Sequence, residues 1–235
     1  MKYENYKRNH VIYPNREKAL DEFVNSTAFI NDKVVRHKLK NSISSNSEDA
    51  LTWSCFDVLR QLPKEKINIA LDEIMEDAFG EKANFLFKDE EDVKIEIGKN
   101  YRSGKDSTEL DASIETKDKL IFIEAKLYSK ITLENKKNPF DQIIKKLRVG
   151  LACAKDTNKE FYFILLDIAP IEYMKNFGKD KSISAIRFKK YKKGNKYLKE
   201  QLIGIDYDDI NKVSKNMGWL TWASLFKTVL RAVVS

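Results

Sequence analysis

The stretch "ELDASIETKDKLIFIEAKLY" (residues 109–128) decides the fold, because it reads as two strands joined by a short turn. Residues 109–116 alternate between polar and apolar side chains, and residues 119–127 contain a continuous apolar run. Both patterns are typical of strands and not of helices. Charged residues nevertheless stand where such strands usually bury their side chains, so the pairing of the two strands has to be considered first.

The length of the turn sets this pairing. A loop of two residues and a loop of four residues give the same register, in which Asp111 lies opposite Glu124 and Glu109 lies opposite Lys126. Paired residues point to the same face of the sheet, with their Cβ atoms about 4.5–5.5 Å apart. A three-residue loop would put the two charged sets on opposite faces, so the pattern favours the even loops.

The two faces of this predicted hairpin have different chemistry. One face is wholly apolar and suits a sheet that receives helices: Leu110, Ala112, Ile114, Ile121, Ile123, Ala125 and Leu127. The other face begins with Leu120 and Phe122 and ends with Asp111, Glu124 and Lys126. The charge is therefore predicted to gather at one end of one face.

Such a cluster has a chemical use. Two facing carboxylates repel each other, and the repulsion rises when they lose water. A Mg²⁺ ion removes that cost, since it prefers hard oxygen ligands and is often held by one or two carboxylates. Lys126 on the same face can stabilise a phosphate or orient a metal-bound water. The alternative is a solvated sheet edge on which Lys126 pairs with Glu109, an interaction worth little.

Helical and strand patterns surround the hairpin. The predicted helices cover one or two segments within 15–39, then 47–62 with Ser47 as its cap, 66–80, 139–155 opened by Pro139, 206–216, and the tryptophan-bearing C-terminal stretch. The predicted strands cover 84–89, 92–98, 109–116, 119–127, 159–169 and 182–191. This order indicates an α/β or α+β sandwich formed as a single domain over residues 1–235.

The order of these residues resembles the PD-(D/E)XK nuclease superfamily. Asp111 matches the first acid of that family, and Glu124-Ala125-Lys126 matches its acid-x-Lys triplet on the next strand. The resemblance implies an α/β, restriction endonuclease-like core over about 45–168, with a central mixed sheet flanked by helices. It also implies that both acids bind Mg²⁺, with Mn²⁺ as a substitute, and that Lys126 assists the attacking water. Residues 1–44 and 169–235 would add flanking helical and basic segments.

Two further positions resemble the family. Glu48 stands where a preceding helix often carries another metal-binding glutamate, and Gln142 resembles the glutamine of a Q-x-x-x-Y motif. Lys146 stands where the tyrosine of that motif would be, and Leu110 replaces the proline that often precedes the first acid. As alternatives, Glu48 is an acid of the first helical turn and Gln142 is a solvated helix residue.

The charge of the chain suggests a polyanionic partner. The net charge is +7, and residues 175–199 hold ten Lys or Arg and a single acid, Asp180. A second basic cluster accompanies the helix after the hairpin: Lys136, Lys137, Lys145, Lys146 and Arg148. Nucleic-acid binding depends largely on such phosphate contacts, and double-stranded DNA is the expected partner. A solubilising surface explains either cluster equally well.

Other features bound the class of protein. Cys55 and Cys153 are expected to be buried free thiols. Residues 218–235 are the most apolar stretch, but Lys227 and Arg231 interrupt it, so no membrane span is expected and a soluble, cytoplasmic protein is predicted. The three tryptophans are expected in the core. A homodimer through the C-terminal stripe is an alternative to packing within the chain; that stripe comprises Trp219, Trp222, Phe226, Leu230 and Val233.

The leading hypothesis is an enzyme, a Mg²⁺-dependent phosphodiesterase acting as a DNA endonuclease of restriction or defence type. Its catalytic residues would be Asp111, Glu124, Lys126, Glu48 and Gln142, with Asp111, Glu124 and Glu48 as metal ligands. The alternative is a catalytically inactive nuclease fold that binds nucleic acid or a protein partner. A structure-specific or RNA-directed nuclease is a third hypothesis.

Overall fold

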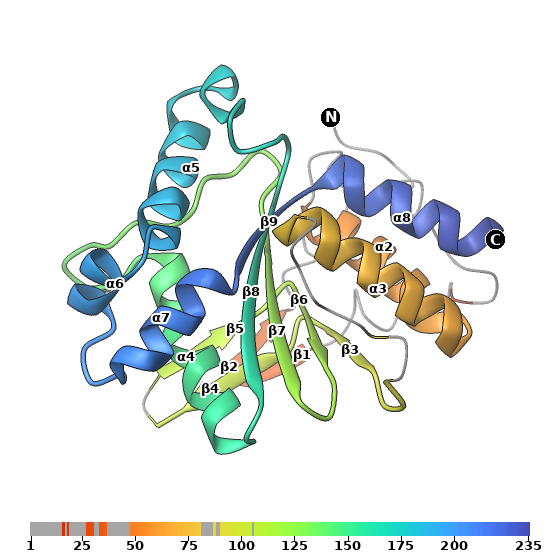
Figure 1. Ribbon diagram of the computed structural model, residues 1–235, viewed down its shortest axis with the longest axis horizontal. Helices are drawn as coiled ribbons and strands as arrows, with labels where there is room; N and C mark the ends of the chain where they lie inside the picture. Colours follow the sequence, from red (N-terminus) through yellow and green to blue (C-terminus); the bar gives the residue numbers. More distant parts are fainter. Residues whose placement is uncertain are drawn as a thin grey trace.

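A five-stranded mixed sheet with helices on both faces forms the centre of the protein (Figure 1). The computed structural model describes residues 48–80, 87, 90–104 and 106–235, together with residues 16, 18, 27–30 and 33–36. The strand order is β3-β6-β7-β8-β9: β3 (Lys94–Ile97), β6 (Ala112–Glu115), β7 (Lys119–Ala125), β8 (Glu160–Asp167) and β9 (Met217–Thr221). β3, β6 and β7 pair antiparallel, whereas β7, β8 and β9 are parallel. The predicted α/β class with a central mixed sheet is confirmed.

The predicted hairpin register is confirmed. Ala112 pairs with Ile123 and Glu115 with Leu120 across β6 and β7, so Asp111, the residue before β6, comes to the level of Glu124 on β7. The turn between the strands closes through the Thr116 N–H, which donates to the carbonyl of Lys119 (3.0 Å).

The strand predicted over 109–116 is interrupted at Leu110 and Asp111. Only its first residue, Glu109, belongs to a separate strand, β5 (Asp106–Glu109). β5 pairs with β4 (Asn100–Ser103), and the sequence pattern did not indicate this pair of strands. This break reverses the side of the sheet on which Leu110 lies. Leu110 packs in the cluster of Leu120 and Phe122, so its predicted place on the opposite apolar face is wrong.

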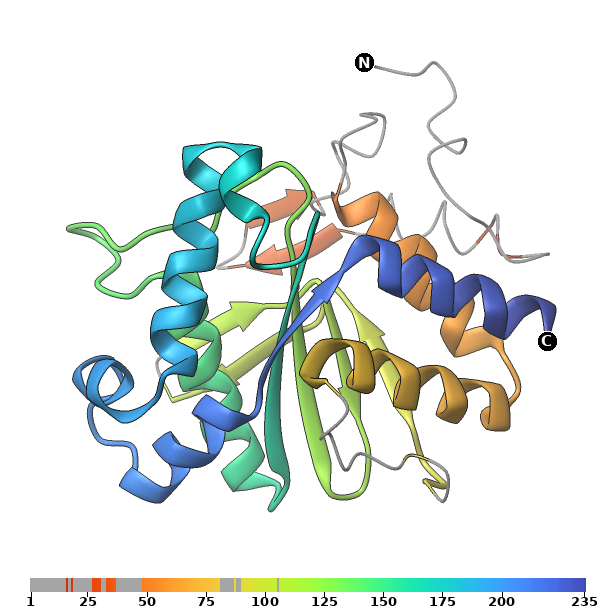
Figure 2. The same cartoon turned by 45° about the horizontal axis from the view of Figure 1, so that its top comes forward.

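Two helical layers cover the sheet (Figure 2). One layer contains α2 (Glu48–Gln61), α3 (Lys64–Phe79) and α8 (Trp222–Val234), which pack with Ile121, Ile123 and Ala125. The other layer contains α4 (Gln142–Asp156), α5 (Lys179–Lys192), α6 (Asn195–Gln201) and α7 (Tyr207–Lys215), with the short 3-10 helix η3 (Met174–Phe177) before α5. This second layer packs with Leu120, Phe122 and Phe163. β7, β8 and β9 therefore contribute alternate residues to two separate hydrophobic clusters.

The predicted strand over 182–191 is wrong, because this segment lies in helix α5. Its apparent alternation is local, whereas its buried residues follow the helical period: Lys181, Ser184, Ala185, Phe188 and Tyr191. The C-terminal stretch is not helical throughout either. Its first residues form β9, where a Cβ on Gly218 would lie 2.8 Å from the Phe79 ring, so glycine allows α3 to approach the strand closely.

Three other boundaries differ from the sequence reading. The helices expected within 15–39 are wrong over the β1–β2 hairpin (Thr27–Ile30 and Lys33–Arg36), and most of that range lies outside the described residues. The predicted Ser47 cap lies outside the described residues. The predicted strand over 84–89 also lies outside them, apart from Phe87, which is buried and does not belong to a strand. Pro139 does not open α4, because Asp141 is the residue that caps it.

The remaining expectations on burial have mixed outcomes. Trp53, Trp219 and Trp222 are buried, and Cys55 and Cys153 are free, with Cys55 buried and Cys153 partly so. The residues of the proposed dimer stripe do not form one exposed surface. Trp219 belongs to β9 and Trp222 is buried within the chain, whereas Leu230 and Val233 are exposed. Among the described residues, no helix is long and apolar enough to cross a membrane.

Candidate functional site

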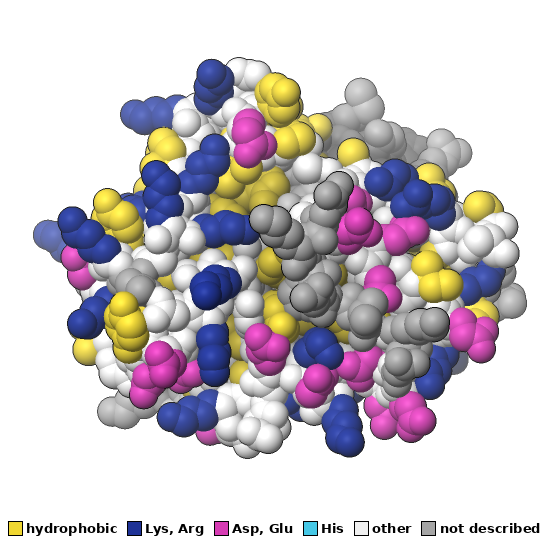
Figure 3. All heavy atoms as spheres, in the orientation of Figure 1, with side chains coloured by type: hydrophobic (Ala, Val, Ile, Leu, Met, Phe, Trp, Pro, Cys, Tyr) yellow, Lys and Arg dark blue, Asp and Glu magenta, His cyan; other side chains and the backbone are white. Residues whose placement is uncertain are grey.

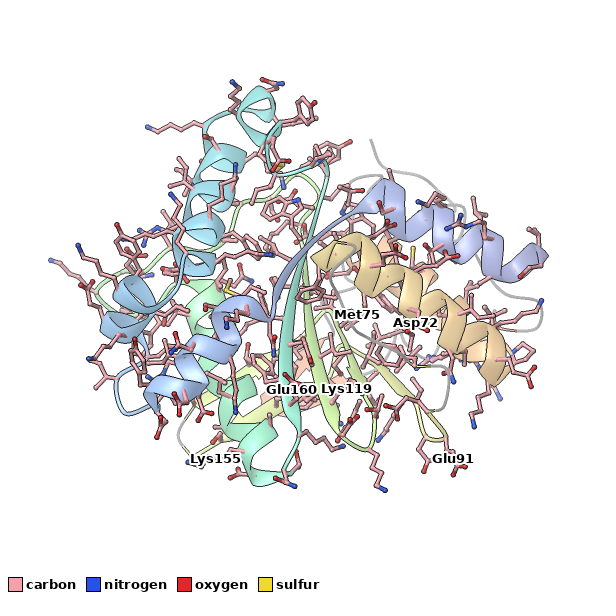
Figure 4. All side chains as sticks on the ribbon, in the orientation of Figure 1. Asp72, Met75, Glu91, Lys119, Lys155 and Glu160 are labelled. Carbon is pink, nitrogen blue, oxygen red and sulfur yellow. The ribbon has the colours of Figure 1, made fainter. Side chains whose placement is uncertain are left out.

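The carboxyl ends of β7 and β8 hold the predicted residues. Lys119 and Glu160, the first residues of these parallel strands, lie side by side at the other end of the sheet (Figure 4). Glu124 lies opposite Leu165 on β8, and its side chain is on the face covered by α4 and α5. Residues that follow the ends of β7 and β8 therefore meet at one edge of the sheet.

Glu124 is the centre of the cluster. It is 2% exposed, and its Oε1 atom accepts hydrogen bonds from Lys126 Nζ (2.7 Å) and from Gln142 Nε2. Its Oε2 atom lies 2.6 Å from Lys146 Nζ. Burial acts to raise the pKa of Glu124, but the charges of Lys146 and Lys126 outweigh it and lower the pKa to about 2. Glu124 is therefore an ionised carboxylate held inside the protein.

Lys126 is equally enclosed, with 5% of its surface exposed. Its Nζ atom lies 3.6 Å from Glu48 Oε1, in addition to its bond to Glu124. Burial acts to lower the pKa of Lys126, but Glu124, Asp111 and Glu48 together raise it above its ordinary value. Its main chain is fixed from two sides, since its N–H donates to Leu166 O (2.7 Å) and its carbonyl accepts from Trp222 Nε1 (3.1 Å).

Asp111 joins the cluster because the strand breaks there. β6 begins at Ala112, and the Ala125 N–H donates to Asp111 Oδ2 (2.7 Å). The aspartate thus binds the main chain of the residue between Glu124 and Lys126. Glu109 instead pairs with Asn100 across the β4–β5 ribbon. This position agrees with the choice of Asp111 over Glu109 as the acid of the proposed site.

Glu48 reaches the same edge from the opposite helical layer. It is the first residue of α2, and its Oε2 atom accepts from Leu127 N (2.9 Å) and from Ser129 Oγ (2.8 Å). This position agrees with an acid of the first helical turn, while the role of Glu48 as a metal ligand stays a prediction.

Gln142 is positioned by the start of α4. Asp141 caps this helix by accepting from Ile144 N (2.9 Å), and it also accepts from Tyr191 Oη of α5 (2.6 Å). Gln142 then accepts from Thr132 N (3.0 Å) and donates to Glu124, so it is not an ordinary solvated residue.

Sequence reasoning missed three residues of the cluster. Lys146 falls in a basic segment expected at the surface, but it is 3% exposed and contacts Glu124; the helical spacing of four from Gln142 was the available signal. Asp167 is the last residue of β8 and lies at the level of Lys126, on the same face of the sheet. Lys181 from α5 donates a hydrogen bond to its Oδ1 atom. Asp167 follows a buried apolar run just as Glu124 does, and this pattern could have identified it.

Asp167 has an incompletely satisfied carboxylate. It is fully buried, and its Oδ2 atom has no hydrogen-bond partner in the described part of the chain. Burial raises the pKa of Asp167, although the Lys181 ammonium opposes this effect. Glu124 and Asp167, at the ends of the adjacent strands β7 and β8, therefore each have a buried contact with a lysine.

The donor atoms fit a hard divalent cation in kind, because the acids at this edge offer carboxylate oxygens. Within the described residues, however, no group of three or more His, Cys, Asp or Glu side chains is arranged to hold a metal. Mg²⁺ is often bound by one or two carboxylates with water, which Asp111 and Glu124 could supply. Both oxygens of Glu124 face lysines, so a cation would compete with them.

Comparison of this chain with protein-family models, with curated proteins and with solved structures finds no match.

Proposed function

We propose that the protein is a metal-dependent nuclease that hydrolyses phosphodiester bonds, in particular a DNA endonuclease of restriction or defence type. The observation that supports this is the convergence of Glu48, Asp111, Glu124, Lys126 and Gln142 at one edge of the sheet. These residues come from two helices on opposite faces, a strand break and a central strand. A solvated sheet edge does not require such buried convergence.

Asp111 and Glu124 would hold Mg²⁺, or Mn²⁺ in its place. The bound ion would supply an activated water and offset charge on the phosphoryl oxygens. Lys126 has a raised pKa, so it stays an ammonium at neutral pH and works as a cation, not as a general base. It would orient the incoming water or stabilise the phosphate through its positive charge. Gln142 would keep Glu124 oriented, and Glu48 would hold Lys126 from the other side.

The charge distribution favours nucleic acid as the substrate. The helices α4 to α7 contain 14 Lys or Arg and 5 Asp or Glu, whereas α2, α3 and α8 contain 5 and 8. Lys and Arg side chains cover much of α5 and α6 at the left of Figure 3. The basic layer is the one that packs on the Glu124 side of the sheet, so phosphates attracted to it would approach the proposed site.

A second function is favoured by one observation. Both oxygens of Glu124 contact lysines, an arrangement that is stable without any metal. A nuclease fold of this kind that binds nucleic acid without cutting it is therefore the alternative.

Incubation with supercoiled plasmid and Mg²⁺ or Mn²⁺, with EDTA as a control, tests the proposal. We expect nicked or linear DNA only with metal, and a rate at least about a hundredfold lower for Asp111→Ala and Lys126→Ala, because the first variant loses a proposed metal ligand and the second loses the positive charge beside the reacting phosphate. Lys64→Ala and Glu65→Ala, which change exposed residues at the start of α3 in the other helical layer, are matched controls and should cut normally.

Each result has a distinct meaning. Cleavage that persists in both site variants would disprove the site. Salt-dependent DNA binding with no cleavage under either metal would favour the binding protein. Cleavage of RNA in preference to plasmid would change the substrate class and leave the site assignment intact.

A further inference from the structure

Lys146 has an unusual place in the proposed site. It lies on α4 one turn after Gln142, it is almost fully buried, and its Nζ atom is 2.6 Å from Glu124 Oε2. The same ammonium donates to the main-chain carbonyl of Glu109, next to the strand break that positions Asp111. A buried lysine requires such partners, because an isolated ammonium inside a protein is costly.

The two lysines on Glu124 are not equivalent. Lys126 is near three carboxylates, those of Glu124, Glu48 and Asp111. Lys146 has an ion pair with Glu124 alone in the described part of the chain. If a divalent cation took Glu124, Lys126 would keep its contact with Glu48. Lys146 would keep only a carbonyl group.

We propose that Lys146 is a built-in competitor for the metal. Its ammonium occupies the Oε2 side of Glu124, so a divalent cation binds there only when Lys146 moves away. This inference rests on the proposed function, because it takes Glu124 as a metal ligand. An ammonium and a divalent cation on one buried carboxylate repel strongly, since little water screens them. The flexible four-carbon stem of lysine allows such a displacement without a change in the helix.

The displaced ammonium has a clear new partner. A phosphate group bound at the metal would be the nearest uncompensated anion, and lysine binds phosphate as a point charge. Metal and phosphate are therefore expected to favour each other's binding, because each one stabilises the arrangement with Lys146 released. A protein that behaves in this way holds metal weakly until the substrate arrives.

Mn²⁺ binding to the full chain without DNA tests this directly by titration calorimetry. We expect Lys146→Met to bind Mn²⁺ at least about tenfold more tightly than the wild type, because a unit positive charge beside the site is removed. Lys146→Gln is a second variant in case methionine disturbs the packing. Lys145→Met, at the preceding and less buried position of the same helix, should change the affinity by less than about twofold.

Inorganic phosphate supplies the second measurement. In the wild type it should tighten Mn²⁺ binding, and this coupling should be lost in Lys146→Met. Thermal unfolding without metal shows whether each variant folds, and Glu124→Gln should abolish binding in every background. Binding that is unchanged or weaker in both folded Lys146 variants overturns the inference and leaves the proposed function standing. Absence of Mn²⁺ binding from all proteins overturns both.

Discussion

The side chain of Glu124 is ionised although it is almost fully buried, and the two lysines beside it are the reason. Placing a charge in a protein interior costs several kcal/mol, which a close ion pair offsets only with good geometry. Here one carboxylate receives Lys126 and Gln142 on Oε1 and Lys146 on Oε2. Such a group contributes little net stability compared with an apolar residue, but removal of one partner is expensive. A buried charge with a strongly shifted pKa is therefore a candidate for a functional group.

Glu124→Gln should therefore destabilise the protein in a pH-dependent way. Folding lowers the pKa of Glu124 from its ordinary 4.5 to about 2, so its charge stabilises the fold fully above pH 4.5. That contribution is lost as the pH falls from 4.5 through 2. Near pH 7 the variant should lose about 3–5 kcal/mol of unfolding free energy, because two lysines stay buried with one partner fewer. Urea denaturation at several pH values measures the difference.

The decisive feature of that experiment is the trend. The difference in unfolding free energy between the wild type and the variant should become smaller when the pH is lowered from about 5 toward about 3. Asp156→Asn, an exposed change on α4, should show no such trend. A gap of constant size over this range would mean that Glu124 is not the buried ionised group described above.

At the residue scale, the sequence identified the acids of the site better than its lysines. Alternation along two strands specified the register, and this register, continued by one residue, brings Asp111 to the level of Glu124. Lys146 was missed although its spacing of four from Gln142 places both on one helical face, because lysine on a helix normally lies on the solvated face. Lys146 is buried because α4 packs on the face of the sheet that carries Glu124, and only the three-dimensional structure shows this contact. The same holds for Lys181 and its contact with Asp167.

At the element scale, the start of α4 determines where Gln142 and Lys146 lie. Asp141 connects this helix to α5, since it accepts from Ile144 N within α4 and from Tyr191 of α5. Burial raises the pKa of Asp141, although both of these hydrogen bonds oppose the change. A single buried cap therefore supports two residues of the proposed site.

Asp141→Ala should cost about 2–3 kcal/mol of unfolding free energy, because it removes a helix cap and leaves the buried Tyr191 hydroxyl without its acceptor. Tyr191→Phe removes only the second interaction, so we expect a smaller loss. Asp141→Asn keeps a capping oxygen and should fall between wild type and alanine. Urea denaturation gives these values, and the plasmid assay should follow the same order. A tyrosine variant that is less stable than Asp141→Ala would contradict this account of the cap.

The elements themselves were predictable where the sequence has a clear pattern. β7 and β8 have apolar runs rich in Ile, Leu and Phe, which are typical of buried strands, and α3 has the contrast between an apolar and a polar face that is typical of a helix. α5 lacks that contrast, because its exposed face is interrupted by Ile186 and its buried face carries Lys181. β9 was missed for another reason: its five residues precede α8 directly, and a short apolar run beside a helix reads as part of it.

At the scale of the whole molecule, the sheet divides the protein into two layers of opposite character. The layer of α2, α3 and α8 has more acids than bases, and the layer of α4 to α7 is strongly basic. The sequence predicted the basic segments but not their assembly on one side. That assembly depends on β9, which joins the sheet parallel to β8 from a distant part of the chain, after the whole of α5, α6 and α7. Local patterns do not contain pairings of this separation.

This asymmetry leads to a prediction about binding. If nucleic acid lies on the basic layer, removing exposed lysines there should weaken binding and make it less sensitive to salt. For duplex DNA, the slope of log affinity against log salt should shrink by about 0.9 for each phosphate that the variant no longer neutralises. We expect this for the triple variant Lys189→Ala, Lys193→Ala and Lys196→Ala on and beside α5 and α6. Fluorescence anisotropy in EDTA, which prevents cleavage, measures the slope from about 50 to 200 mM salt.

The matched control removes the same charge from the other layer. Lys64→Ala, Lys66→Ala and Lys227→Ala lie on α3 and α8, so the net charge of the protein changes equally while the basic layer stays intact. Their slope should equal that of the wild type, because long-range charge alone is screened within about 10 Å at about 0.1 M salt. If the two triple variants reduced the slope alike, net charge and not the layer of α4 to α7 would govern binding. The route of the substrate to Glu124 and Lys126 would then have to lie across another surface.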